Sequence, residues 1–105
     1  NFISTGSTYW IPDEEIQILE KNATNGDKNS AFKLYQYHMF VSLDQDLEFK
    51  WLEIAAKNGH PIAQSNLADL FFTQGNKEKA IFWAKKAYRN GAKLPDELKI
   101  LININ

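Results

Sequence analysis

Cysteine is absent from this sequence, and proline, glycine and methionine are scarce, at three, five and one residues. Without cysteine the chain has no disulfide bonds, no thiolate metal sites and no cysteine nucleophile. A strong excess of either charge is also missing, because 12 basic and 13 acidic residues leave a net charge of −1. Proteins that hold a nucleic-acid backbone usually carry a basic surplus. We therefore expect neither a disulfide scaffold nor a nucleic-acid partner.

Long apolar runs are missing too, because charged or amide residues interrupt every one of them. A membrane-spanning helix needs about 20 consecutive, mostly apolar residues, so we expect no membrane span. Hydrophobic residues nevertheless make up 44% of the chain and charged residues 24%, which is typical of a folded globular domain. The length of 105 residues suits one domain with one core.

A short pattern, W-x-x-x-A-x-x-N-G, occurs twice, at residues 51–59 and 83–91. A weaker copy at 18–26 keeps the apolar start and the Asn-Gly end but lacks the tryptophan and the small residue. The copies are displaced by 32 and 33 residues, and a period of about 34 residues is typical of helical hairpins stacked in a repeat protein. The sequence therefore predicts an internal repeat of helical hairpins.

Helical periodicity flanks each Asn-Gly pair, although Asn-Gly between apolar runs is a strong signal for a β-hairpin. The stripe before Gly59 has the i, i+4, i+7, i+8 spacing of a helix and consists of Leu47, Trp51, Ile54 and Ala55. We therefore interpret each glycine as a left-handed cap that ends a helix. After an irregular segment, 1–11, we predict six helices, at 12–23, 28–40, 45–57, 61–73, 76–89 and 95–102.

The central part of the chain resembles the Sel-one-like repeat family. The resemblance extends over about residues 18–92 and is carried by Trp51, Ala55-Ala56, Gly59-His60, Ala63, Leu67-Ala68 and Phe71. It implies an all-α fold, a short α-solenoid of antiparallel helical hairpins. About two full repeats with partial capping helices would form one domain, 12–105. The loop at 72–76 is shorter than is usual in that family and has tetratricopeptide spacing, and the two families share the superhelical architecture.

Few side chains in the sequence are suited to chemistry. Neither His38 nor His60, the two histidines, has a second histidine or a cysteine at ligand spacing, and the acidic run 44–48 lacks the glycine and final glutamate of a calcium loop. Most carboxylates cluster in predicted first helical turns, where the helix dipole explains them. We expect no catalytic, cofactor or metal site. An enzyme that uses His38 with a nearby carboxylate is the alternative.

The resemblance also implies a binding surface, because in this architecture the first helix of each hairpin lines the concave face. Tetratricopeptide geometry, carried over residue by residue, predicts these partner-binding positions: Asn29, Phe32, Gln36, Met39, Ser65, Asp69 and Phe72. The two aromatic rings and the thioether, with polar neighbours, have the composition of a binding patch. In the alternative interpretation, the terminal segments of the chain pack over these positions.

Helical solenoids present surfaces and carry no built-in chemistry, so we expect a non-enzymatic protein–protein interaction module. One recurring role among similar bacterial proteins is that of an immunity protein that neutralises a secreted antibacterial toxin, often in the periplasm. This is our leading prediction, and an adaptor or regulator for a signalling or envelope-assembly partner is the alternative. The chain starts at Asn1 without a leader, which suggests a removed N-terminal segment and favours the periplasm over the cytoplasm. The oligomeric state is left open.

Overall fold

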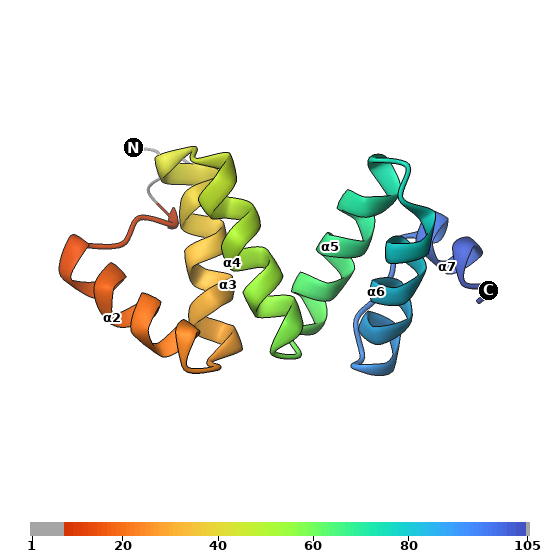
Figure 1. Ribbon diagram of the computed structural model, residues 1–105, viewed down its shortest axis with the longest axis horizontal. Coiled ribbons are helices and arrows are strands. Elements are labelled where there is room, and N and C mark those ends of the chain that lie inside the picture. The colour runs from red at the N-terminus through yellow and green to blue at the C-terminus, as the bar shows by residue number, and fades with distance from the viewer. Residues whose placement is uncertain (1–7, 105) are drawn as a thin grey trace.

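The computed structural model describes residues 8–104, and within this range the chain forms six α-helices and no strand. The helices are α2 (Asp13–Thr24), α3 (Lys28–Tyr37), α4 (Gln45–Lys57), α5 (Pro61–Thr73), α6 (Lys77–Arg89) and α7 (Asp96–Leu101) (Figure 1). The predicted all-α class is confirmed, and most helix limits agree with the prediction to within one residue. Of the predicted irregular segment, residues 1–7 lie outside the described residues.

The main departure from the predicted helices is at the end of α3. We predicted one helix through residue 40, whereas α3 ends at Tyr37 and the chain continues as a π-helical turn, His38–Ser42. Leu43 then takes a left-handed conformation, with φ 57°. A π-helical turn accommodates one extra residue within an otherwise helical path. Its apolar spacing stays close to that of an α-helix, so periodicity alone does not reveal it.

The three Asn-Gly pairs end helices, as predicted. Gly26, Gly59 and Gly91 have φ values of 105°, 96° and 91°, a region that glycine adopts without a Cβ clash. After Gly59, the amide of His60 donates to the carbonyl of Ala55 at 3.0 Å, and the same bond closes the other two turns. This is the geometry of a Schellman cap. The Asn-Gly pairs are therefore turns between consecutive helices and not β-hairpins.

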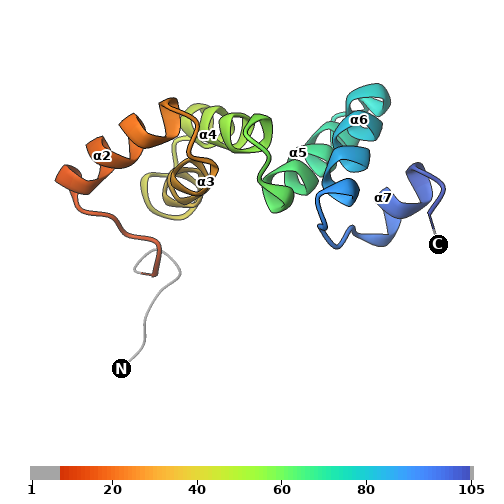
Figure 2. The same ribbon diagram turned by 90° about the horizontal axis from the view of Figure 1, so that it is seen from below.

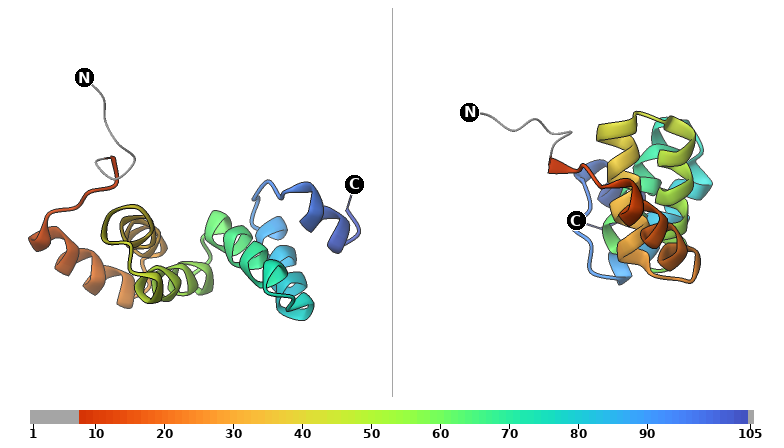
Figure 3. Two further views of the ribbon diagram at one scale, coloured as in Figure 1. Left: turned by 90° about the horizontal axis from the view of Figure 1, so that it is seen from above. Right: turned by 90° about the vertical axis from the view of Figure 1, so that its left-hand side faces the viewer.

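The helices form a row in sequence order (Figure 1). Packing is most extensive within the pairs α3–α4 and α5–α6, and the contact between α4 and α5 is smaller. Those two helices meet around residues 57–61 and diverge toward their other ends (Figure 1). In Figure 2, α3, α5 and α7 lie toward one side of the row and α2, α4 and α6 toward the other. Figure 3 shows residues 8–11 and α7 on the same side.

The core follows the predicted apolar stripes. Trp51 is only 2% exposed, and the small residues predicted to allow close helix approach, Ala55, Ala68, Ala84 and Ala87, are fully buried. One buried cluster runs from Ile11 to Ala80, and a second joins α5, α6 and α7 around Leu98. Trp83 is partly buried and packs against both clusters. The predicted packing role of the two tryptophans is therefore met fully by Trp51 and in part by Trp83.

Candidate functional site: a groove and a crevice along α5

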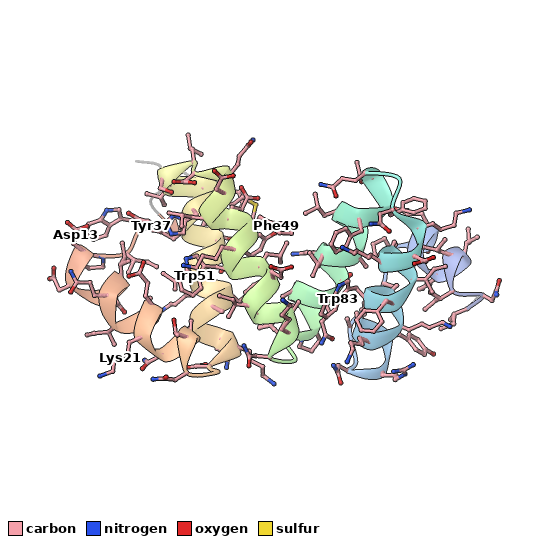
Figure 4. All side chains as sticks on the ribbon, viewed as in Figure 1. Asp13, Lys21, Tyr37, Phe49, Trp51 and Trp83 are labelled. Carbon is pink, nitrogen blue, oxygen red and sulfur yellow. The ribbon has the colours of Figure 1, made fainter. Side chains whose placement is uncertain are left out.

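A crevice lies between α4 and α5, where the two helices diverge. It consists of two cavities of about 360 and 440 Å³ that share Glu48, Leu52 and Leu70. Phe49 projects from α4 toward α5 (Figure 4) and lines the smaller cavity. We call this the α4–α5 crevice, and its full lining is Tyr35, Met39, Gln45, Glu48, Phe49, Leu52, Asn66, Asp69, Leu70, Thr73 and Gln74. Its apolar floor and polar rim resemble the composition of protein-binding patches.

The charged side chains on the rim of the crevice, Glu48 and Asp69, are both acidic. Neither takes part in an ion pair within residues 8–104, where the pairs found are Lys33–Glu15 and Lys57–Glu53. Burial raises the pKa of the nearby Tyr35 hydroxyl, the hydrogen bond from Asn66 lowers it, and the negative charge of Glu48 raises it further. The crevice therefore presents unneutralised negative charge beside apolar surface.

A larger groove of about 760 Å³ lies at the start of α5, against the loop that leads to α7. We call it the His60 groove, and it is lined by His60, Pro61, Ile62, Ser65, Asn66, Gly91, Ala92, Lys93, Leu94 and Pro95. Ile62 is 54% exposed there, and Ser65 is 8% exposed. Asn66 lines both the groove and the crevice. The two depressions therefore follow one another along α5.

His60 is held in place by two interactions. Its Nδ1 accepts a hydrogen bond from the amide of Ala63 at 3.2 Å and so caps α5. Its ring stacks on Phe32, with 4.0 Å between the ring centroids. Burial lowers the pKa of His60, and the positive charge of Lys28 lowers it further. Because Nδ1 is an acceptor, the neutral ring carries its proton on Nε2.

Four of the seven predicted partner-binding residues lie in or against these depressions. Met39 and Asp69 line the crevice, and Ser65 lines the groove. Phe32 reaches the groove indirectly, through its stacking on His60. The structure thus places these four residues in or against the two depressions. Whether they bind a partner stays a prediction.

The other three predicted residues lie elsewhere. Gln36 lines a separate depression beside the N-terminal segment Thr8–Ile11, with Glu15 and Lys33. Asn29 is exposed, and its backbone amide donates to the Asp27 carboxylate at 3.0 Å as part of the α3 cap. Phe72 is 37% exposed and lines neither the groove nor the crevice. The single continuous stripe that the repeat geometry suggested is therefore divided.

Sequence reasoning missed several residues that line the depressions. Ile62 lies outside the core stripe of its helix, and an apolar residue in an exposed first turn is a signal that could have identified it. Lys93 also lines the groove, on the loop that leads to α7. Phe49 and Leu70 are partly buried, because α4 and α5 diverge at their ends of the crevice. Nothing local in the sequence encodes that divergence.

His38 lies outside both depressions and is 5% exposed. Its Nδ1 is 2.7 Å from the Ser42 hydroxyl, and its Nε2 has no hydrogen-bond partner among the described residues. Burial lowers its pKa, whereas the charges of Asp44 and Glu20 raise it. Within residues 8–104 no carboxylate forms a hydrogen bond with the ring. The same residues contain no group of three potential metal ligands.

No protein-family model and no solved structure matches the chain. The chain is similar to an uncharacterized protein of Escherichia coli (strain K12), YibG, with 33% identity over 95 residues. The match covers 84% of this chain and 62% of YibG, so the chain spans less than two thirds of that relative. In the part of the chain that the structure describes, no helix has the length and apolar character needed to cross a membrane. The Sel-one-like resemblance stays a prediction.

Proposed function

We propose that the chain is a non-enzymatic module that binds another protein along α5. The observation that carries this proposal is the succession of the His60 groove and the α4–α5 crevice, joined at Asn66. Both combine apolar surface with a few polar groups, as protein interfaces do. The chain has room for about one standard interface, which buries about 800 Å² on each partner. A single dedicated partner is therefore favoured over several.

The proposal includes a short α-solenoid of antiparallel hairpins. It is supported by the repeated pattern, by the identical caps after Gly26, Gly59 and Gly91, and by the packing of each helix mainly on its neighbours in sequence. Repeats of this kind use one layer of helices as a binding surface. On that basis α3, α5 and α7 form the binding side.

The kind of partner follows from the family resemblance alone. A secreted antibacterial toxin, neutralised by an immunity protein, stays the leading prediction, and a signalling or envelope-assembly partner stays the alternative. Either role uses the same surface, and they differ in what is bound. The neighbouring gene would distinguish the two roles. A toxin gene would favour an immunity protein, and a gene for a sensor or for polysaccharide machinery would favour an adaptor.

The proposal is tested by affinity capture from the native organism, with quantification of bound proteins by mass spectrometry. Ile62→Asp introduces a charge into the groove at a position that is already 54% exposed. Phe82→Asp is the matched control, because Phe82 is 53% exposed on α6, away from both depressions. We expect Ile62→Asp to reduce the bound partner at least about tenfold, as for an interface hot spot, and Phe82→Asp to leave it unchanged.

Circular dichroism and the melting temperature of each variant show whether it folds. Equal capture by Ile62→Asp and the unaltered chain would contradict the proposed surface. Phe72→Asp adds a further position on α5 and reports whether the interface extends beyond the two depressions. A folded His38→Gln variant that still binds the partner but has lost its biological effect would contradict the non-enzymatic assignment.

A further inference from the structure

We infer that the partner docks as an extended segment with an acidic residue at the His60 groove, a basic residue at the α4–α5 crevice and an apolar side chain between them. This inference rests on the proposed function and specifies the chemistry of the partner. Three features of the surface support it: the charges at its two ends, the separation of these ends along α5 and the polar groups between them.

The two ends of the surface carry opposite charge. Lys93 lines the His60 groove, and Lys28 lies close enough to His60 to lower its pKa. Glu48 and Asp69 line the crevice. None of these four side chains forms an ion pair within residues 8–104. A segment with complementary charges would place each of its charged residues beside an unpaired opposite charge of the surface. A segment bound in the reverse direction would place like charges together.

The separation of the two ends of the surface along α5 fits a short stretch of extended chain. The groove begins at His60 and the crevice contains Asp69, on the same helix. Nine residues of α-helix span about 13 Å, at 1.5 Å per residue. An extended chain covers that distance in about four residues, at 3.3 Å each. The acidic and basic residues of the segment are therefore expected about four positions apart.

Polar groups between the two ends favour an extended segment over a helix. The amide nitrogen of Asn66 donates to the Tyr35 hydroxyl at 3.3 Å. The side-chain carbonyl of Asn66 and the hydroxyl of Ser65 form no hydrogen bond with the described residues, and both side chains line the groove. A helix satisfies its own backbone groups, whereas an extended chain needs outside partners for them. Asn66 and Ser65 supply an acceptor and a hydroxyl for that purpose.

The apolar part of the segment has a place in the groove. Ile62 of α5 is exposed in the groove, and Leu94 and Pro95, on the loop before α7, also line it. An apolar side chain inserted there would cover Ile62. Because removing apolar surface from water is favourable by about 25 cal/mol per Å², this contact would add affinity while the charges set the direction of the segment.

The test uses phage-displayed random 12-residue peptides panned against the full chain. Enriched peptides are resynthesised with fluorescein, and their Kd values are measured by anisotropy against the unaltered chain and five variants. Lys93→Glu and Asp69→Lys reverse the two charges of the surface. Lys85→Glu and Glu78→Lys are the matched controls, because they make the same kinds of change at exposed positions of α6. Ile62→Asp identifies the peptides that occupy the groove.

We expect the enriched peptides to carry an acidic and a basic residue about four positions apart, in one constant order. Lys93→Glu and Asp69→Lys should each weaken binding on the order of tenfold, and the two controls should change it less than about twofold. Replacing the acidic residue of the peptide with lysine should restore its binding to Lys93→Glu. The same peptide should bind the unaltered chain poorly.

The two possible failures differ. Peptides that lose binding in Ile62→Asp but are insensitive to both charge reversals would overturn this inference and leave the proposed function standing. A library that yields only peptides insensitive to Ile62→Asp, or no binding peptide, would overturn both. The inference would also be overturned if the lysine-substituted peptide bound the Lys93→Glu variant no better than it bound the unaltered chain.

Discussion

The pattern W-x-x-x-A-x-x-N-G occurs in α4 and again in α6, and the two copies lie in different surroundings. The first copy ends at Gly59, and one capping residue, His60, leads into the 13-residue helix α5. The second copy ends at Gly91, and the longer loop 92–95 leads into the six-residue helix α7. The caps are the same in both copies, so the pattern determines how a helix ends. It does not determine what packs on the helix afterwards.

Matching side chains in the two copies show the difference. Ala56 is buried, whereas its counterpart Tyr88 is 50% exposed. Asn58 donates to the carbonyl of Ile54 in its own helix at 2.8 Å. Its counterpart Asn90 donates instead to the side chain of Gln64 at 2.9 Å. The residue at the position of Gln64 one repeat earlier is Ala31, which offers Asn58 no side-chain acceptor.

The largest expected effect distinguishes the two tryptophans. Trp51→Ala should lower the free energy of unfolding by about 3–5 kcal/mol, as for other buried aromatic residues. Trp83→Ala should cost less, on the order of half as much, because Trp83 is only partly buried. Urea denaturation of both variants measures the difference. Equal losses would show that the two copies are equally buried in solution and would remove the contrast.

The next effect concerns Gln64, which bonds to both copies. Its amide nitrogen donates to the Ala56 carbonyl at 3.0 Å, and its oxygen accepts from Asn90. Gln64→Met keeps most of the volume and removes both bonds, so it should cost about 1–3 kcal/mol, the usual penalty for leaving a buried polar group unpaired. Asn58→Ala, which removes an exposed bond within one helix, is the control and should cost less than about 1 kcal/mol. Urea denaturation provides the measurement, and a neutral Gln64→Met would argue against the bridge.

A smaller effect tests what the two copies share. Gly59→Ala and Gly91→Ala each place a Cβ on a left-handed backbone, and neither Cβ would meet another atom within 4 Å. The cost is therefore conformational and should be about 1–2 kcal/mol in each case. Thermal melting of the two variants should give nearly equal losses. A marked inequality would show that packing, and not the cap alone, distinguishes the two turns.

The smallest effect depends on pH. Burial lowers the folded-state pKa of His60 below its ordinary value of 6.5, so the unfolded chain takes up the proton first as the pH falls. Stability is then complete above about pH 6.5 and is lost as the pH falls toward the folded-state pKa. His60→Asn retains a capping side chain that does not titrate.

The melting temperature of the unaltered chain should fall more between pH 7.5 and pH 5 than that of His60→Asn. The His60→Asn variant should still show a smaller fall in melting temperature, which His38 accounts for because burial also lowers its pKa. Identical pH profiles for the two proteins would show that His60 does not contribute.

The helices and their caps could be predicted from the sequence because local signals determine them. Asn-Gly pairs, first-turn prolines and apolar stripes lie within a few residues of the ends they define. The π-helical turn at His38 could not be predicted, because its apolar spacing is nearly that of an α-helix. The limits of the short α7 were predicted to within one residue. The loop before it places Lys93 and Leu94 in the groove, and the course of that loop depends on packing against α5.

The candidate site was predicted only in part. Met39, Ser65 and Asp69 are among the positions predicted from tetratricopeptide geometry, and they line the depressions. Phe49 and Leu70 line the crevice because α4 and α5 diverge, and that angle results from the whole interface between two hairpins. Gln36 was predicted to bind the partner but lines neither the groove nor the crevice, and the N-terminal segment lies beside it. Tertiary packing therefore decides which of the predicted side chains line a depression and which do not.

The bridge through Gln64 also has a consequence for how the molecule opens. Helical-repeat proteins can fray one unit at a time when adjacent units interact weakly. Here one buried side chain of α5 holds the last turn of α4 and the end of α6, so opening of either end leaves one polar group of Gln64 without its partner. In native-state hydrogen exchange we expect amides at the two helix ends to share one opening free energy. Gln64 would thus join two repeat units into a single cooperative block.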